Sequence, residues 1–222
     1  MTFLHLLADF SEASILIPFL VMLSRKTFVK SELRILAIYI FVIFVRNLLS
    51  TITDIWYLWK NEIINNLFLY NLSSVVGFYI LSYIYYNLIT NILWRRIIIF
   101  FWVVFAVFIL LDFQNGTLNP STALFNKYSY SVSSLMMITV VLAYFYQLLQ
   151  NLLPGDITKF PYFWLSAGAL LYFAGTLFTY IFLFQASRDL ERISWVFDAI
   201  LSIFFNIAIA LAFWHSDKLE QK

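Results

Sequence analysis

Seven long apolar segments recur along the chain, with short polar stretches between them. We expect them at residues 4–23, 33–53, 63–87, 93–112, 121–150, 160–184 and 193–214. The clearest breaks are the stretches SRKTFVKSE, LDFQNGTLNPST, LLPGDITKFP and QASRDLER. At about 1.5 Å per helical residue, each segment is long enough to cross a hydrocarbon core about 30 Å thick. The pattern predicts an all-α polytopic membrane protein with a bundle of seven transmembrane helices.

Composition supports a chain that is surrounded by lipid. Of the 222 residues, 63% are hydrophobic and only 12% are charged, against roughly 25% charged residues in an average soluble domain. A soluble fold could not cover so much apolar surface with polar groups. Because no connection exceeds about a dozen residues on this division into helices, we expect residues 1–222 to form a single domain.

Basic residues predict which end of the bundle faces the cytoplasm. The loops after the first, third and fifth spans, together with the C-terminal tail, hold Arg25, Lys26, Lys30, Arg34, Arg95, Arg96, Lys159, Lys218 and Lys222. The opposite side holds only Lys60, Lys127, Arg188 and Arg192. The positive-inside rule therefore predicts an N-terminus outside and a C-terminus inside.

Polar residues recur at helical spacing in the predicted outer halves of several spans. Examples are His5, Asp9 and Glu12 in the first span and Ser194, Asp198, Ser202 and Asn206 in the seventh. Residues at this spacing share one helical face. We therefore expect a polar network or ligand cavity in the outer half, formed by Asp9, Glu12, Arg46, Tyr70, Ser73, Ser131, Asp198, Ser202 and Asn206.

Arg46 interrupts the apolar run IYIFVIFVRNLLS of the second span. Insertion scales place an arginine at mid-bilayer about 2.5–3.5 kcal/mol uphill, a cost that snorkelling or pairing with an acid reduces. Arg46 could reach toward the headgroups near Asp54, or it could face inward and pair with Glu12 or Asp198. We favour the pair, because three isolated ionised groups in one outer half would each be costly.

Two spans differ from the others. The fourth, IIIFFWVVFAVFILL, is apolar all round, which is typical of a peripheral helix. The sixth carries Gly168, Tyr172, Gly175 and Thr179 on one face, a spacing of small residues that favours close helix packing. We also hypothesise that span four or this face of span six mediates association with a partner or with a second copy as a homo-oligomer.

The sequence argues against several kinds of chemistry. A retinal Schiff base needs a lysine deep in the last span, and all seven lysines lie in loops, helix ends or the tail. The two histidines, His5 and His215, are predicted on opposite sides of the membrane. No hydrolase or phosphate-binding motif is present. We therefore expect no enzymatic activity, no cofactor and no metal, and nothing indicates a nucleic-acid partner.

The number and length of the spans resemble those of small sugar carriers, which contain a proline in the first helix of each repeat. Pro18 fits that pattern, but the chain contains no Pro-Gln motif and no convincing repeat. A small-solute transporter is therefore the alternative function. A structural or assembly role in the membrane also stays open.

The last two spans, PYFWLSAGALLYFAGTLFTYIF and ISWVFDAILSIFFNIAIALAFW, resemble the closing pair of the seven-helix modules of bacterial signalling receptors. This resemblance implies a sensory or accessory subunit in a cell membrane, namely a bacterial inner membrane. The polar outer half would admit a small ligand from the outer side, or simply hold the bundle together. Since we expect no output domain after the seventh span, the signal would pass to a separately encoded membrane or kinase partner.

Overall fold

The computed structural model describes residues 3–27, 33–60, 66–114, 127–150, 157–183 and 188–216. Within these ranges every regular element is a helix: α1 (Phe3–Ala13), α2 (Leu16–Ser24), α3 (Arg34–Lys60), α4 (Leu67–Leu88), α5 (Ile92–Gln114), α6 (Lys127–Gln150), η1 (Ile157–Lys159), α7 (Pro161–Leu183) and α8 (Arg188–Trp214). Seven spans among the described residues are long and apolar enough to cross a membrane. This confirms the all-α, seven-span prediction.

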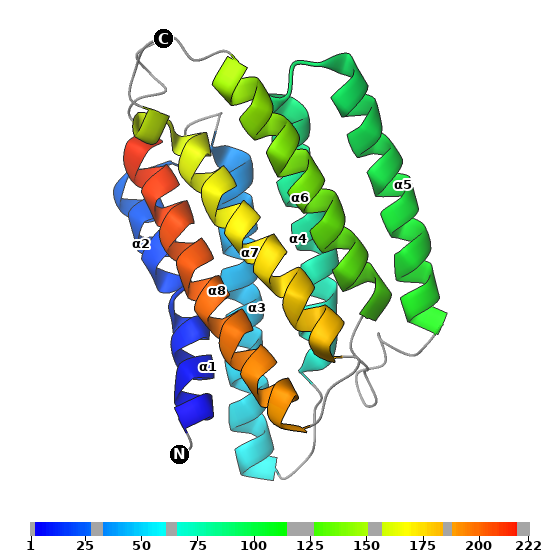
Figure 1. Ribbon diagram of the computed structural model, residues 1–222. Helices are drawn as coiled ribbons and strands as arrows, with labels where there is room; N and C mark the ends of the chain where they lie inside the picture. The colour runs from blue at the N-terminus through cyan, green and yellow to red at the C-terminus, as the bar shows by residue number, and fades with distance from the viewer. Residues whose placement is uncertain are drawn as a thin grey trace.

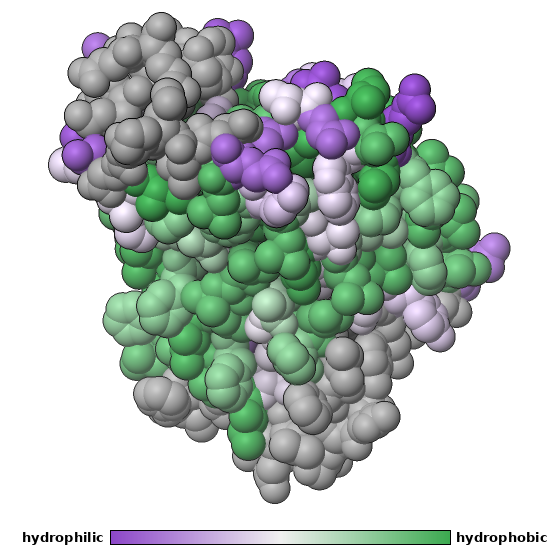
Figure 2. All heavy atoms as spheres, turned by 45° about the horizontal axis from the view of Figure 1, so that its top comes forward, coloured by the Kyte–Doolittle hydropathy of each residue, from purple (hydrophilic) through white to green (hydrophobic). Residues whose placement is uncertain are grey.

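The helices form one bundle in which α1 begins at one end and α8 finishes at the other (Figure 1). Hydrophobic side chains cover the wall in the view of Figure 2, and hydrophilic ones gather at the end where α8 finishes. The exposed residues of that end include Asn87, Asn91, Arg96 and Lys159. The apolar wall and the polar end are what a bilayer and its water interface require of a multi-pass protein.

The first span is broken into α1 and α2, whereas the sequence pattern predicts one continuous helix. Pro18 has no N–H to donate to the carbonyl of Ser14, so the regular helical bond is missing there. Instead, the N–H of Ile17 donates to that carbonyl over 3.0 Å, and the N–H of Ile15 donates to the Glu12 carbonyl over 3.4 Å. These bonds reach back three residues instead of four, so the chain tightens and turns before α2 begins.

Helix α5 lies at the edge of the bundle, as its apolar composition predicts (Figure 1). One of its faces packs inward through the buried residues Ile98, Phe105 and Ile109. Asp112, which the sequence pattern places at the start of a loop, is also buried. Its Oδ2 accepts hydrogen bonds from the N–H, over 2.8 Å, and from the hydroxyl of Ser129, in the first turn of α6. Asp112 therefore satisfies backbone donors that no helical carbonyl reaches.

The small-residue face of α7 packs against α8. A Cβ atom at Gly168 would lie 2.4 Å from Cβ of Ala208, and one at Gly175 would lie 2.3 Å from Cδ1 of Leu201. This confirms the packing interpretation of the face. It also corrects the hypothesis that this face binds a partner or a second copy, because α8 of the same chain already covers it.

The half of the bundle at the end where α8 finishes is a tightly packed apolar core. Its fully buried side chains include Leu33, Leu36, Tyr85, Ile209 and Phe213. The hydroxyl of Tyr85 donates to Ser166 over 3.1 Å, so the polar atom of this ring also has a partner. These side chains belong to one cluster of buried residues.

The close contact between α7 and α8 predicts that a methyl group added on α7 clashes with α8. Removal of the facing methyl group on α8 should relieve that clash. We expect Gly168→Ala to lower the free energy of unfolding by about 1–3 kcal/mol, because the added methyl group overlaps Ala208. Ala208→Gly alone should cost about 0.5–1 kcal/mol through helix propensity. In the double variant the clash is absent, so its loss should be smaller than the sum of the two single losses. Unfolding of the purified proteins measures all three values, and strictly additive losses would contradict the close contact.

Candidate functional site

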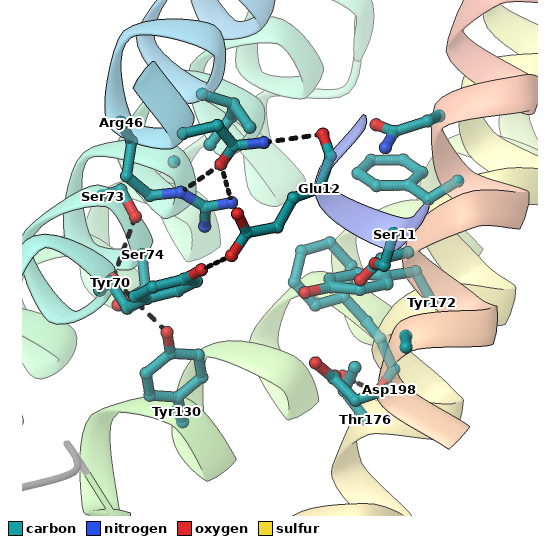
Figure 3. Close-up of a pocket in the computed structure, with 18 of the residues that line it drawn as sticks. Ser11, Glu12, Arg46, Tyr70, Ser73, Ser74, Tyr130, Tyr172, Thr176 and Asp198 are labelled. Atoms are coloured by element: carbon teal, nitrogen blue, oxygen red, sulfur yellow. Dashed lines mark hydrogen bonds between the residues drawn. The ribbon is translucent and has the colours of Figure 1, made fainter. Parts of the chain in front are cut away.

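A cavity of about 670 Å³ lies among α1, α3, α4, α6, α7 and α8, in the half of the bundle where α8 begins (Figure 3). Its polar lining consists of Ser11, Glu12, Arg46, Asn47, Asn66, Tyr70, Ser73, Ser74, Tyr130, Ser133, Ser134, Tyr172, Thr176, Asp198, Ser202 and Asn206, with Tyr39 and Trp195 among the aromatic side chains. Pockets of roughly 300–1,000 Å³ are the usual size for small-molecule ligands.

The structure brings seven of the nine residues singled out from the sequence to this cavity: Glu12, Arg46, Tyr70, Ser73, Asp198, Ser202 and Asn206. Asp9 and Ser131 are not among its lining residues. Asp9 is exposed, and Ser131 is turned by about 100° from its neighbour Tyr130, which does line the cavity. Spacing along one helix therefore identified the faces but misplaced residues at their edges. The side chains of His5 and Asp54 lie outside the described residues.

Arg46 faces the cavity instead of snorkelling toward the headgroups (Figure 3). Its Nε and Nη2 atoms donate to Oδ1 of Asn47 over 2.9 and 2.5 Å. Its guanidinium carbon lies 4.4 Å from the centre of the Tyr70 ring, a cation–π distance.

The expected direct pair between Arg46 and an acid is corrected by these contacts. Glu12 reaches Arg46 through Tyr70, whose hydroxyl donates to Oε1 of Glu12 while its ring face meets the guanidinium. The Asn47 amide oxygen and the face of the Tyr70 ring, both uncharged, contact the guanidinium. Tyr70 therefore lies between the two charged side chains and contacts both Arg46 and Glu12.

Two asparagine side chains donate hydrogen bonds to residues at the break in the first span. The Nδ2 group of Asn47 donates to the Glu12 carbonyl over 2.9 Å, and that of Asn206 donates to the Ser14 hydroxyl over 2.7 Å. The Glu12 carbonyl also accepts from the Ile15 N–H over 3.4 Å, so the Asn47 amide adds a second and shorter bond there. The sequence analysis missed Asn47. The signal that could have found it is Pro18, since a proline in a span predicts that another helix must supply a donor.

Asp198 lies on the opposite wall of the cavity, near Tyr172 and Thr176 (Figure 3). Its Oδ1 atom is buried and has no hydrogen-bond partner among the described residues. The ring of Tyr172 stacks on that of Phe205, with centroids 5.1 Å apart and planes inclined by 13°. Tyr39 approaches the same Phe205 ring, at 6.3 Å. This wall therefore combines an unpartnered carboxylate oxygen with several ring faces.

The described part of the chain contains no group of three or more His, Cys, Asp or Glu side chains placed to hold a metal ion. The polar groups of the lining are hydroxyls, amides, phenols and three charged side chains. Such groups hold a small molecule by hydrogen bonds and charge.

We predict that Asn47 contributes more to stability than Asn206. Asn47→Ala would leave both the Glu12 carbonyl and Arg46 without this partner, so we expect a loss of about 1–3 kcal/mol. Asn206→Ala should cost about 1 kcal/mol or less, because the Ser14 hydroxyl still donates to the Ser11 carbonyl. Thermal unfolding of the two matched variants compares these losses, and equal losses would argue against Asn47 as the main support.

Searches of protein-family models, of curated proteins and of solved structures give no match to this chain.

Proposed function

We propose that the protein is a non-enzymatic sensory or accessory subunit of a membrane signalling system, and that it binds a small molecule in the cavity. The observation that carries this proposal is the division of the bundle into two unlike halves. One half holds a cavity with polar groups from six helices, and the other is filled by buried apolar side chains. A site with this shape suits capture of a ligand from one side of the membrane.

Helix α8 provides a route from the cavity to the other end of the bundle. It carries Asp198 beside the cavity and ends at Trp214, whose ring lies 4.1 Å from the guanidinium carbon of Arg25. Because α7 and α8 meet without free space at Gly168 and Gly175, a ligand that displaces one of them would shift both. A partner protein bound at the end where α8 finishes would respond to that shift.

The orientation follows from the distribution of basic residues. In this proposal the cavity opens toward the outer side and α8 finishes at the cytoplasmic side, where a separately encoded membrane or kinase partner would dock. The membrane would be a bacterial inner membrane, as the resemblance to signalling modules implies. Arg25 and Arg95 belong to this end, and each guanidinium lies over an aromatic ring, Trp214 and Tyr86 respectively.

One observation favours transport as a second candidate. The break between α1 and α2 lies beside the cavity, and discontinuous helices commonly form the substrate sites of secondary transporters. Transport requires access from both sides in turn, so it needs a second state in which the packed half opens. The two candidates therefore differ in whether that half ever meets water.

The proposed orientation predicts the behaviour of C-terminal reporters. In a bacterial host, a phosphatase that is active only in the periplasm should be silent when fused after Lys222. A green fluorescent protein fused at the same position should fluoresce, because it folds in the cytoplasm. Strong phosphatase activity with a dark fluorescent fusion would reverse the proposed topology.

Cysteine labelling tests whether access is one-sided, and the chain contains no native cysteine to interfere. We expect Ser73→Cys and Ser202→Cys to react with an impermeant reagent from the outer side, because both positions line the cavity. The matched control is Ser82→Cys on the same helix as Ser73, because Ser82 is buried outside the cavity. Cysteine at Ile209 should also resist the reagent from either side. Labelling of Ile209→Cys from the cytoplasmic side would favour the transporter.

A further inference from the structure

The cavity carries an unequal number of positive and negative groups. Among the described residues of its lining, Arg46 is the one basic side chain, whereas Glu12 and Asp198 are both acidic. If all three are ionised, the formal charge of the cavity is negative. The position of each group decides where that charge is available to a ligand.

Arg46 and Glu12 already belong to one network. Two nitrogen atoms of Arg46 donate to Asn47, its guanidinium faces the Tyr70 ring, and Glu12 accepts the Tyr70 hydroxyl. The positive and negative charges of these two residues therefore offset each other at short range. An anionic ligand at Arg46 would also have to lie close to the Glu12 carboxylate.

Asp198 lies outside this network. Its buried Oδ1 atom has no hydrogen-bond donor in the described part of the chain. A buried carboxylate oxygen left without a hydrogen-bond donor carries an uncompensated desolvation cost. A ligand that brings both a donor and a positive charge would remove that cost.

Aromatic rings that line the same cavity suit the same kind of ligand. Tyr172 and Phe205 stack together, Tyr39 approaches Phe205, and all three line the cavity. Phe205 lies seven residues after Asp198, two helical turns along the same face of α8. Ring faces attract ammonium groups, with the strongest effect where water is excluded.

Resting on the proposed function, we propose that the cavity binds a small organic monocation, with its ammonium group between Asp198 and the rings of Tyr39, Tyr172 and Phe205. The cavity volume of about 670 Å³ leaves room for the remainder of such a molecule, which would meet the hydroxyl and amide groups of the lining. Arg46 repels a second positive charge, so the site selects against dications.

The test uses three probes that differ mainly in one terminal group: 2-phenylethylammonium, 2-phenylethanol and phenylacetate. Choline and its uncharged isostere 3,3-dimethylbutan-1-ol form a second set with a quaternary centre. Each probe is titrated against the purified full-length protein in lipid nanodiscs, and binding is followed by thermal stability and by calorimetry. We expect both cations to bind at least tenfold more tightly than their uncharged counterparts, and phenylacetate to bind most weakly.

Substitution locates the effect at Asp198. Asp198→Asn should weaken binding of the cations at least tenfold and leave the uncharged probes unchanged. Asp9→Asn is the matched control, because it removes one acid of the same chain outside the cavity lining. Should Asp198→Asn fail to fold, protection of Ser202→Cys from labelling by the cations, and not by the alcohols, gives the same information in a chain that keeps Asp198.

The outcomes separate this inference from the function on which it rests. Equal binding of cations and alcohols, or cation binding that Asp198→Asn does not change, overturns the cation site and leaves a small-molecule receptor standing. If no probe of any charge binds or protects Ser202→Cys, the receptor function fails together with the inference.

Discussion

The arrangement of this bundle depends on one constraint: a polar backbone group inside the hydrocarbon layer must find its partner within the protein. Pro18 breaks the first span, and at the break the carbonyls of Glu12 and Ser14 accept from N–H groups three residues further along the chain. Asn47 from α3 and Asn206 from α8 contact the two sides of that break. The same two bonds hold α1 between α3 and α8, which are far apart in the sequence. They therefore also position α1 as one wall of the cavity.

The charged groups obey the same constraint by a different route. Arg46 contacts a neighbouring amide and a ring instead of a carboxylate, and Glu12 joins the network through the Tyr70 hydroxyl. This arrangement keeps the guanidinium and the first acid close without placing them in direct contact. Asp198, on the other wall, has no comparable partner for its Oδ1 atom. In the proposed cation site, this difference between the two acids sets the chemical preference of the cavity.

Packing divides the bundle into a half that holds the cavity and a half of buried apolar side chains. Glycines of α7 allow α8 to approach until an added methyl group would collide with it. In the half where α8 finishes, large side chains such as Tyr85 and Phe213 are fully buried. In the proposed function, a change at Asp198 would pass along α8 as a rigid movement, because a close-packed region resists local deformation.

The sequence by itself determined the spans, because an apolar run of about 20 residues has few stable alternatives to a membrane helix. It also placed Glu12, Tyr70, Asp198 and Ser202 on polar faces, since the helical repeat fixes the angle between residues on one helix. Only the tertiary structure decided that Arg46 contacts Asn47, that Asp112 caps α6, and that the Gly168 face meets α8. These partners depend on how each helix is rotated and tilted against its neighbours. That geometry results from the packing of side chains far apart in the sequence. The repeat of polar and apolar residues along one helix contains no information about that packing.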